Sequence, residues 1–189
     1  MSHRVRPAVP SDLDSAARVL AAAFDRYPWT RWALPEDRYA ERLEEIQRLY
    51  LGHALDHGIV LVDDQVRAVA AFLPPDTPAP AERIQQRIVE LHGSRLAALS
   101  ALPRPDPPAG CWTLETAGVD PAHQGSGLGT AVTAEGLAML DQQGASAALE
   151  TSDKRNVRLY QRLGFATAAT TTIPDGPIVY SMTRNPQSR

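Results

Sequence analysis

The sequence predicts one domain of the α/β (α+β) class. Strand-like apolar runs alternate along the chain with segments whose apolar residues recur every three or four positions, as in an amphipathic helix. In the carboxy-terminal half, a strand, a glycine-rich loop, a helix and a second strand follow one another, an order that makes those two strands parallel. The length of 189 residues suits a single domain, taken as 1–189.

The amino-terminal half begins with helical and hairpin patterns. Leu13 and Phe24 bound a run of apolar residues at helical spacing, with Ser11 as the expected cap, and Gly58 stands where a second helix should stop. Two apolar runs around residues 63–65 predict an antiparallel hairpin. The expected elements are a strand over 4–8, helices over 13–24 and 35–57, and hairpin strands over 59–62 and 66–73.

Two proline-rich stretches, 74–80 and 103–110, flank a helical region over 81–102 that Gly93 and Ser94 interrupt. Neither flank contains an obvious complete core, so these loops do not separate domains. We interpret 74–110 as an insertion that shapes a substrate pocket.

The carboxy-terminal segment 111–184 is the more informative part. Gly144 closes its first helix, and Ser152 or Asp153 can cap the second. The expected elements are a strand over 111–119, a loop over 124–129, a helix over 130–143, a strand over 147–151, a helix over 155–163, and strands over 166–173 and 178–184.

Composition excludes several classes of protein. A net charge of −3 argues against nucleic acid as the main partner, since such proteins concentrate positive charge. No signal peptide or membrane span is visible, so a cytoplasmic location is expected. Cys111 is the single cysteine and is expected to be a buried small hydrophobe. His53 and His57 share a helix face without a third ligand, so we expect no metal site.

The glycine loop has the pattern Gln124-x-x-Gly127-x-Gly129 between a strand and a helix. Glycines let the backbone approach a ligand, and the N–H groups that begin the helix favour a phosphate. A Walker loop is disfavoured because no Lys-Ser/Thr follows, and a Rossmann fingerprint because Thr130 replaces its third glycine. A coenzyme A pyrophosphate loop and an ordinary glycine turn remain.

A second motif follows at the short helix. Asn156 and Tyr160 are four residues apart and share one face, where an isolated tyrosine would usually be core. Together with the glycine loop, this motif resembles the GNAT acetyltransferase family, and its puromycin N-acetyltransferase branch over nearly the whole chain. The stretches that carry the resemblance are 20–24, 27–28, 93–98, 118–129, 149–152, 160–165 and 182–184.

The resemblance implies a GNAT fold, a mixed and mostly antiparallel sheet with helices on both faces, and acetyl-CoA as co-substrate without a metal. In the family, the Tyr160 position commonly protonates the departing thiolate and the Asn156 position contacts the cofactor. Ser126 stands where relatives often carry a basic residue. The cofactor-binding residues implied are Ala117, Gly118, Val119, Gln124, Gly125, Ser126, Gly127, Leu128, Gly129, Thr130, Asn156 and Tyr160.

Chemistry on an amine needs a base, because amines attack only when unprotonated. Glu150 at the end of a strand is the first candidate. Glu115 is the second, expected on the face of Ala117 and Val119 by strand alternation. The backbone N–H near Ala117 is expected to polarise the thioester carbonyl. Tyr27, Trp29 and Trp32 are expected either to line the acceptor pocket or simply to pack together.

The predicted function is therefore N-acetylation of a small amine, such as an aminonucleoside antibiotic of the puromycin type, with a role in antibiotic resistance. The alternatives are acetylation of a peptide or protein amine and a non-catalytic acyl-CoA sensor, with a nucleotide-binding protein more distant. A homodimer is expected by analogy only.

Overall fold

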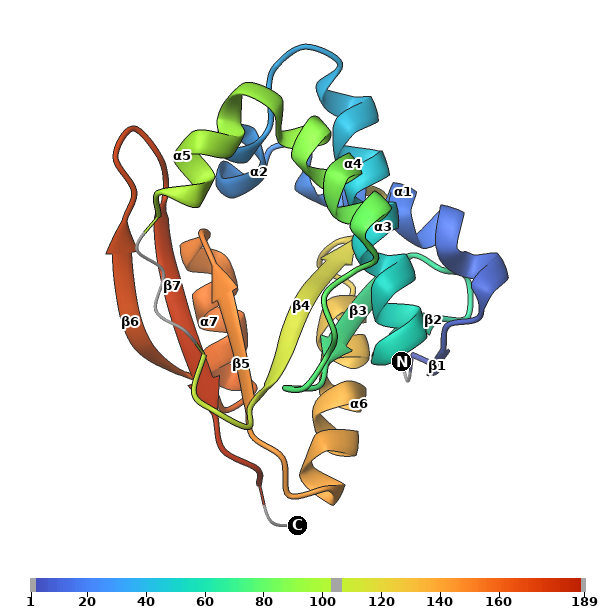
Figure 1. The fold of residues 1–189 in the computed structure, drawn as a ribbon. Coiled ribbons are helices and arrows are strands. Elements are labelled where there is room, and N and C mark those ends of the chain that lie inside the picture. The colour runs from blue at the N-terminus through green and yellow to red at the C-terminus, as the bar shows by residue number, and fades with distance from the viewer. Residues whose placement is uncertain (1–2, 103–106, 188–189) are drawn as a thin grey trace.

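A computed structural model describes residues 3–102 and 107–187 (Figure 1). Its sheet has seven strands in the order β1-β2-β3-β4-β5-β7-β6. Adjacent strands in the described residues are antiparallel except β4 and β5, which are parallel as predicted. The strands are β1 (Val5–Pro7), β2 (Ile59–Asp63), β3 (Ala68–Leu73), β4 (Trp112–Val119), β5 (Ala147–Thr151), β6 (Ala166–Thr172) and β7 (Ile178–Arg184).

Helices cover both faces of the sheet, so the predicted architecture is confirmed. On one face, α1 (Leu13–Phe24) and α3 (Tyr39–His57) bury small and branched side chains of β2 and β3. On the other face, α6 (Leu128–Gln142) and α7 (Lys154–Arg162) pack over a core that includes Phe72, Leu149 and Tyr160. The two cores meet at the sheet and fix the position of β4 between them.

Two expectations for the amino-terminal half are corrected by the structure. The helix expected from residue 35 begins at Tyr39, after Arg38 in a left-handed conformation. Ser11 was expected to cap α1, and that prediction is wrong. A short 3₁₀ turn (η1, Pro10–Asp12) precedes α1, and the Asp12 carboxylate accepts the Val9 N–H at 2.9 Å.

The segment after the hairpin packs on the rest of the domain. The turn η2 (Gly93–Arg95) separates α4 (Glu82–His92) from α5 (Leu96–Ser100), where the interruption was predicted. Arg87 of α4 pairs with Glu45 of α3 at 2.6 Å, and Arg42 donates to the Leu91 carbonyl at 3.0 Å. Part of the expected loop over 103–110, namely 103–106, lies outside the described residues.

The two central strands separate along their length. In β4 and β5, Trp112 pairs with Ala147 and Thr113 with Ala148, and the pairing ends there. On its other side, β4 contains a β-bulge, because Leu114 lies opposite Phe72 and Thr116 lies opposite Ala71. Glu115 is the extra residue of this bulge.

Gly136 of α6 lies against the ring of fully buried Phe72, which a Cβ at this position would overlap. Changing Gly136 to alanine is therefore expected to lower the free energy of unfolding by about 1–3 kcal/mol, despite the better helix propensity of alanine. Gly52 of α3 is the control, since a Cβ there would meet only Leu13 Cδ2 at 3.9 Å. Gly52→Ala should stabilise by about 0.5–1 kcal/mol. Equal denaturant midpoints for the two variants would contradict this packing.

Candidate active site

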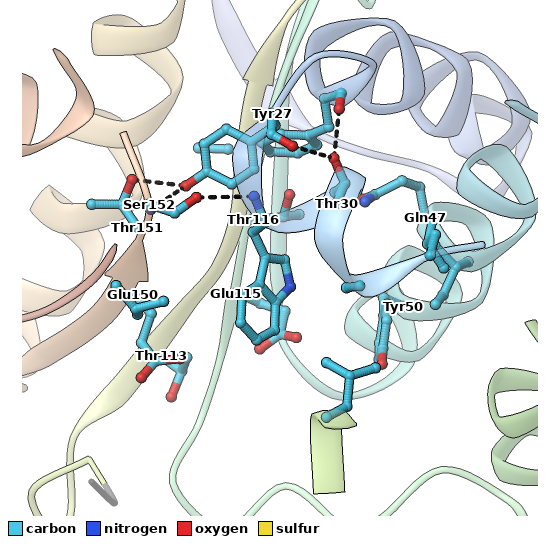
Figure 2. Close-up of a pocket in the computed structure, with 18 of the residues that line it drawn as sticks. Tyr27, Thr30, Gln47, Tyr50, Thr113, Glu115, Thr116, Glu150, Thr151 and Ser152 are labelled. Carbon is cyan, nitrogen blue, oxygen red and sulfur yellow. Dashed lines mark hydrogen bonds between the residues drawn. The ribbon is translucent and has the colours of Figure 1, made fainter. Parts of the chain in front are cut away.

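A cavity of about 510 Å³ opens where β4 and β5 separate. Strand residues from β4 and β5 form one wall (Figure 2). The helix α2 (Pro28–Ala33), the helices α3, α4 and α5, and the loop after α1 form the opposite wall. Tyr160 and Asn156 of α7 line it from the other face of the sheet. The cavity therefore joins the two faces of the sheet through the gap between the strands.

Tyr160 is positioned by a capped helix and an aromatic neighbour. The Asp153 carboxylate accepts the Arg155 N–H at 2.8 Å and so caps α7, which confirms one of the two predicted caps. The ring of Tyr160 packs edge-on against Phe165, with centroids 5.8 Å apart. Burial raises the pKa of Tyr160 well above its ordinary value, and nearby Tyr27 raises it further. The phenol therefore keeps its proton at neutral pH.

Tyr27 fixes the loop after α1 to the end of β5. Its hydroxyl accepts the Ser152 N–H at 2.7 Å and lies within hydrogen-bond distance, 2.8 Å, of the Thr151 hydroxyl. The Trp29 N–H donates to the Ser152 hydroxyl at 3.2 Å. Figure 2 shows these contacts between the loop after α1 and the end of β5. Tyr27 thus lines the cavity and also holds its two walls together.

The carboxylates of Glu115 and Glu150 reach the cavity from neighbouring parallel strands (Figure 2). Glu150 lies beyond the last residue of β5 that pairs with β4, and the Ser181 hydroxyl of β7 donates to its Oε1 at 3.3 Å. The lining residues that the structure describes include no lysine or arginine. Burial lowers the pKa of His92, which also lines the cavity. The site is therefore acidic and favours a cationic ligand.

The prediction that Glu115 lies on the same face of the sheet as Ala117 and Val119 is wrong. Ala117 and Val119 pack with Leu114 against the α6 side of the sheet, whereas a Cβ on Gly118 would meet Leu20 of α1 at 2.9 Å. The bulge at Glu115 breaks the two-residue alternation between Glu115 and Ala117. The bulge thereby directs the Glu115 carboxylate into the cavity, while Ala117 stays on the face of the sheet that packs against α6.

The backbone of β4 offers polar groups to the gap. The Asp120 N–H donates to the Arg67 carbonyl at 2.8 Å, so Asp120 and Arg67 form a hydrogen-bonded pair. Such pairs alternate with non-bonded ones, which places Ala117 and Val119 opposite Ala70 and Ala68 in non-bonded pairs. Their N–H and C=O groups point away from β3 and toward the gap. The Val119 carbonyl accepts from Gln124 Nε2 at 3.2 Å, consistent with this direction.

The glycine loop runs from Gln124 into α6. Gly125 and Gly127 have φ values of 79° and 89°, and Gly127 is the N-cap of α6. The helix begins at Leu128 rather than Thr130, so Leu128, Gly129 and Thr130 form its first turn, whose N–H groups have no intrahelical acceptor.

These features fit a pyrophosphate. The loop needs left-handed glycines, and the first helical turn directs unpaired N–H groups to one spot. Ser126 brings no cation, and its hydroxyl donates to the His123 carbonyl at 2.6 Å. His3 Nε2 lies 2.7 Å from the Ser126 carbonyl. This hydrogen bond joins the loop to the amino-terminal segment.

Of the aromatic residues expected at the pocket, Trp29 lines it and Trp32 does not. Trp32 stacks on Trp29, with ring centroids 5.6 Å apart, and lies beside Gly176 of the β6–β7 turn. Sequence reasoning missed Gln47, a polar residue within the apolar stripe of α3, and His92 of α4. A polar residue on a buried helix face is the signal that could have revealed Gln47.

Other candidate groups lie apart from this chemistry. Cys111 is buried as predicted, and burial raises the pKa of its thiol. The rings of His53 and His57 stack with centroids 4.6 Å apart. Over residues 3–102 and 107–187, no group of three or more histidine, cysteine or acidic side chains could hold a metal, and no helix is long and apolar enough to cross a membrane.

Comparison with known proteins identifies the family. The family model described as Acetyltransferase (GNAT) family matches residues 23–165. The chain belongs to the GNAT acetyltransferase family. A stretch of 53 residues is 53% identical to a mycothiol acetyltransferase of Salinispora tropica, covering 26% of this chain and 17% of that relative. A stretch of 56 residues is 46% identical to the Streptomyces avermitilis protein of the same name, covering 28% and 18%. The chain therefore matches less than a fifth of the length of these curated relatives.

Solved GNAT structures cover the whole chain. A Corynebacterium glutamicum structure described as histone acetyltransferase HPA2 and related acetyltransferase aligns with a TM-score of 0.79 and 25% identity, over 100% of this chain and 99% of that one. The PaiA N-acetyltransferase of Thermoplasma acidophilum, solved in complex with coenzyme A, aligns with a TM-score of 0.63 and 12% identity, over 98% and 99%. The second likeness supports the fold alone.

Proposed function

We propose that this GNAT protein transfers the acetyl group of acetyl-CoA to the amine of a small molecule. The observation that carries the proposal is one cavity that combines a buried, protonated Tyr160 with the carboxylates of Glu115 and Glu150. A proton donor and a proton acceptor within one site are what amine acylation requires.

The residues from β4 to α6 would hold the co-substrate. The glycine loop and the first turn of α6 would bind the pyrophosphate through backbone N–H groups. The outward N–H and C=O groups of Ala117 and Val119 would bind the pantetheine arm as a strand edge does. Asn156 lines the cavity one helical turn before Tyr160. When bound, acetyl-CoA supplies the activated acyl group as a thioester.

The protein groups then move protons and stabilise charge. Glu150 accepts a proton from the ammonium form of the acceptor, since an alkylamine is mostly protonated at neutral pH. The Ala117 N–H donates to the carbonyl oxygen as negative charge develops there. The carbon–nitrogen bond would form as the carbon–sulfur bond breaks, and Tyr160 would give its proton to the sulfur. The nitrogen would lose its second proton as the amide forms, and that proton balances the one needed to restore the Tyr160 phenol. Glu115 attracts the cationic acceptor into the cavity.

The helical wall favours a small acceptor over a protein amine. Residues of α2, α3, α4 and α5 line the cavity opposite the strands, so an acceptor in the cavity lies between two walls. Aromatic Tyr27 and Trp29 offer flat apolar surface beside the carboxylates. An aminonucleoside such as puromycin is one such amine. A cytoplasmic location, a role in antibiotic resistance and a homodimer are further parts of this proposal.

The test is to incubate the purified protein with acetyl-CoA and an equimolar mixture of puromycin, small aromatic amines and a peptide with a free amino terminus. Mass spectrometry should show one acetyl group on a small amine and release of an equal amount of thiol. Acetylation of the peptide alone would contradict the small-molecule proposal. Binding of acetyl-CoA without turnover of any amine would favour the non-catalytic sensor.

A further inference from the structure

The helical wall of the cavity carries an amide that lacks a partner. Gln47 is only 8% exposed, yet its side-chain amide makes no hydrogen bond to any residue that the structure describes. Its polar atoms are not sealed in the core, because Gln47 lines the cavity. Figure 2 shows the amide directed from α3 into that space.

Two other polar side chains of this wall, Thr30 and His92, are already engaged in hydrogen bonds. The Thr30 hydroxyl donates to the Phe24 carbonyl at 2.7 Å and accepts from the Tyr39 hydroxyl at 3.0 Å. His92 Nδ1 lies 3.0 Å from the Ala33 carbonyl and donates to it. The Gln47 amide differs from both because it has no hydrogen-bond partner among the described residues. A buried amide of this kind needs a hydrogen-bond partner from solvent or from a ligand.

From this geometry we propose that Gln47 determines acceptor specificity by binding a neutral hydrogen-bonding group at the end of the substrate away from its amine. The inference rests on the proposed function. The amine itself belongs near the strand wall, where Glu115 and Glu150 lie, and Gln47 lies on the opposite, helical wall (Figure 2). An acceptor that fills the cavity therefore reaches both.

The chemistry of the wall selects a neutral group. The residues lining it beside Gln47 are mostly apolar: Leu34, Ile46, Ile88, Leu96 and Leu99. A carboxylate here would lack a cation, because the described lining includes no lysine or arginine, and a second ammonium would be desolvated. A hydroxyl, ether, carbonyl or amide pairs with the Gln47 amide at no such cost.

The test uses matched amines that differ by one hydroxyl: tyramine against 2-phenylethylamine, and serotonin against tryptamine. The wild type should acetylate the hydroxylated member with a kcat/KM about 10–100-fold higher in at least one pair, because an amine without the hydroxyl leaves the amide unpaired. Gln47→Leu should abolish that preference while retaining turnover of the apolar amine. Gln86→Leu, at an exposed position of α4 outside the cavity lining, is the control and should leave the preference intact.

A second readout separates a binding role from a structural one. If Gln47 serves the ligand, Gln47→Leu should melt no lower than the wild type, because it removes an unpaired buried amide. A lower melting temperature, a preference that survives in Gln47→Leu, or acetylation of both members at equal rates by the wild type would each overturn the inference. Thiol release with none of these amines but with others would also overturn it and leave the proposed function standing. No thiol release with any amine would contradict the proposed function itself.

Discussion

Replacing Tyr160 by phenylalanine is expected to lower kcat by about 10²–10³-fold, with little change in the KM for acetyl-CoA. The substitution removes the proton that the departing thiolate needs and keeps the ring that packs on Phe165. Steady-state assays of thiol release at saturating amine measure the loss.

The matched control is Tyr180→Phe, the same change at a half-buried tyrosine of β7 that does not line the cavity. It should leave kcat unchanged. Because burial raises the pKa of Tyr160 above its ordinary value, the acid stays protonated through the alkaline range. Loss of activity in the wild type between pH 8 and 9 that vanishes in Tyr160→Phe would therefore contradict its role as the acid.

Changing Glu150 to glutamine should lower kcat/KM at neutral pH by about 10²–10⁴-fold, because the amine then loses its proton without help. Glu150 is held in place by its neighbours. Tyr27 bonds to Thr151 and Ser152 immediately after it, and the Ser181 hydroxyl donates to its Oε1. The deficit should shrink as the pH rises toward the pKa of the amine, which a pH profile of the variant measures.

Glu115→Gln and Glu36→Gln are the comparisons. Glu115→Gln should mainly raise the KM for the amine, since it removes attraction for a cation from the cavity. Glu36→Gln changes an exposed carboxylate outside the lining and should have no effect. A larger loss in kcat for Glu115→Gln than for Glu150→Gln would show that the base is assigned to the wrong strand.

The sequence predicted most of the fold because its local signals agree. Gly58 ends α3, Asp153 caps α7, and the strand–loop–helix–strand order made β4 and β5 parallel. The predicted cap at Ser11 failed because Ser11 lies inside the 3₁₀ turn Pro10–Asp12, so that Asp12 becomes the N-cap residue of α1. Several neighbouring residues can serve as the N-cap of a helix, and the backbone conformation decides which one does. The spacing of residues in the sequence does not contain that information.

The site was predicted in part. Tyr160, Asn156, Glu150, Tyr27 and Trp29 all reach one cavity. The face of Glu115 was wrong because a β-bulge depends on the register between β3 and β4, which alternation along one strand cannot reveal. The bonds from Tyr27 to the end of β5 join residues more than 120 positions apart, so only the folded chain shows them.

The central claim is that the gap between β4 and β5, with the glycine loop at its end, binds acetyl-CoA. Calorimetric titration of acetyl-CoA into the wild type and a Gly127→Val variant tests it most directly, since Gly127 has a left-handed φ of 89° at the start of α6. The account predicts saturable binding at one site in the wild type and at least tenfold weaker binding in the variant, with both proteins folded. Absence of binding to the wild type, or equal affinity in the two proteins, would contradict it.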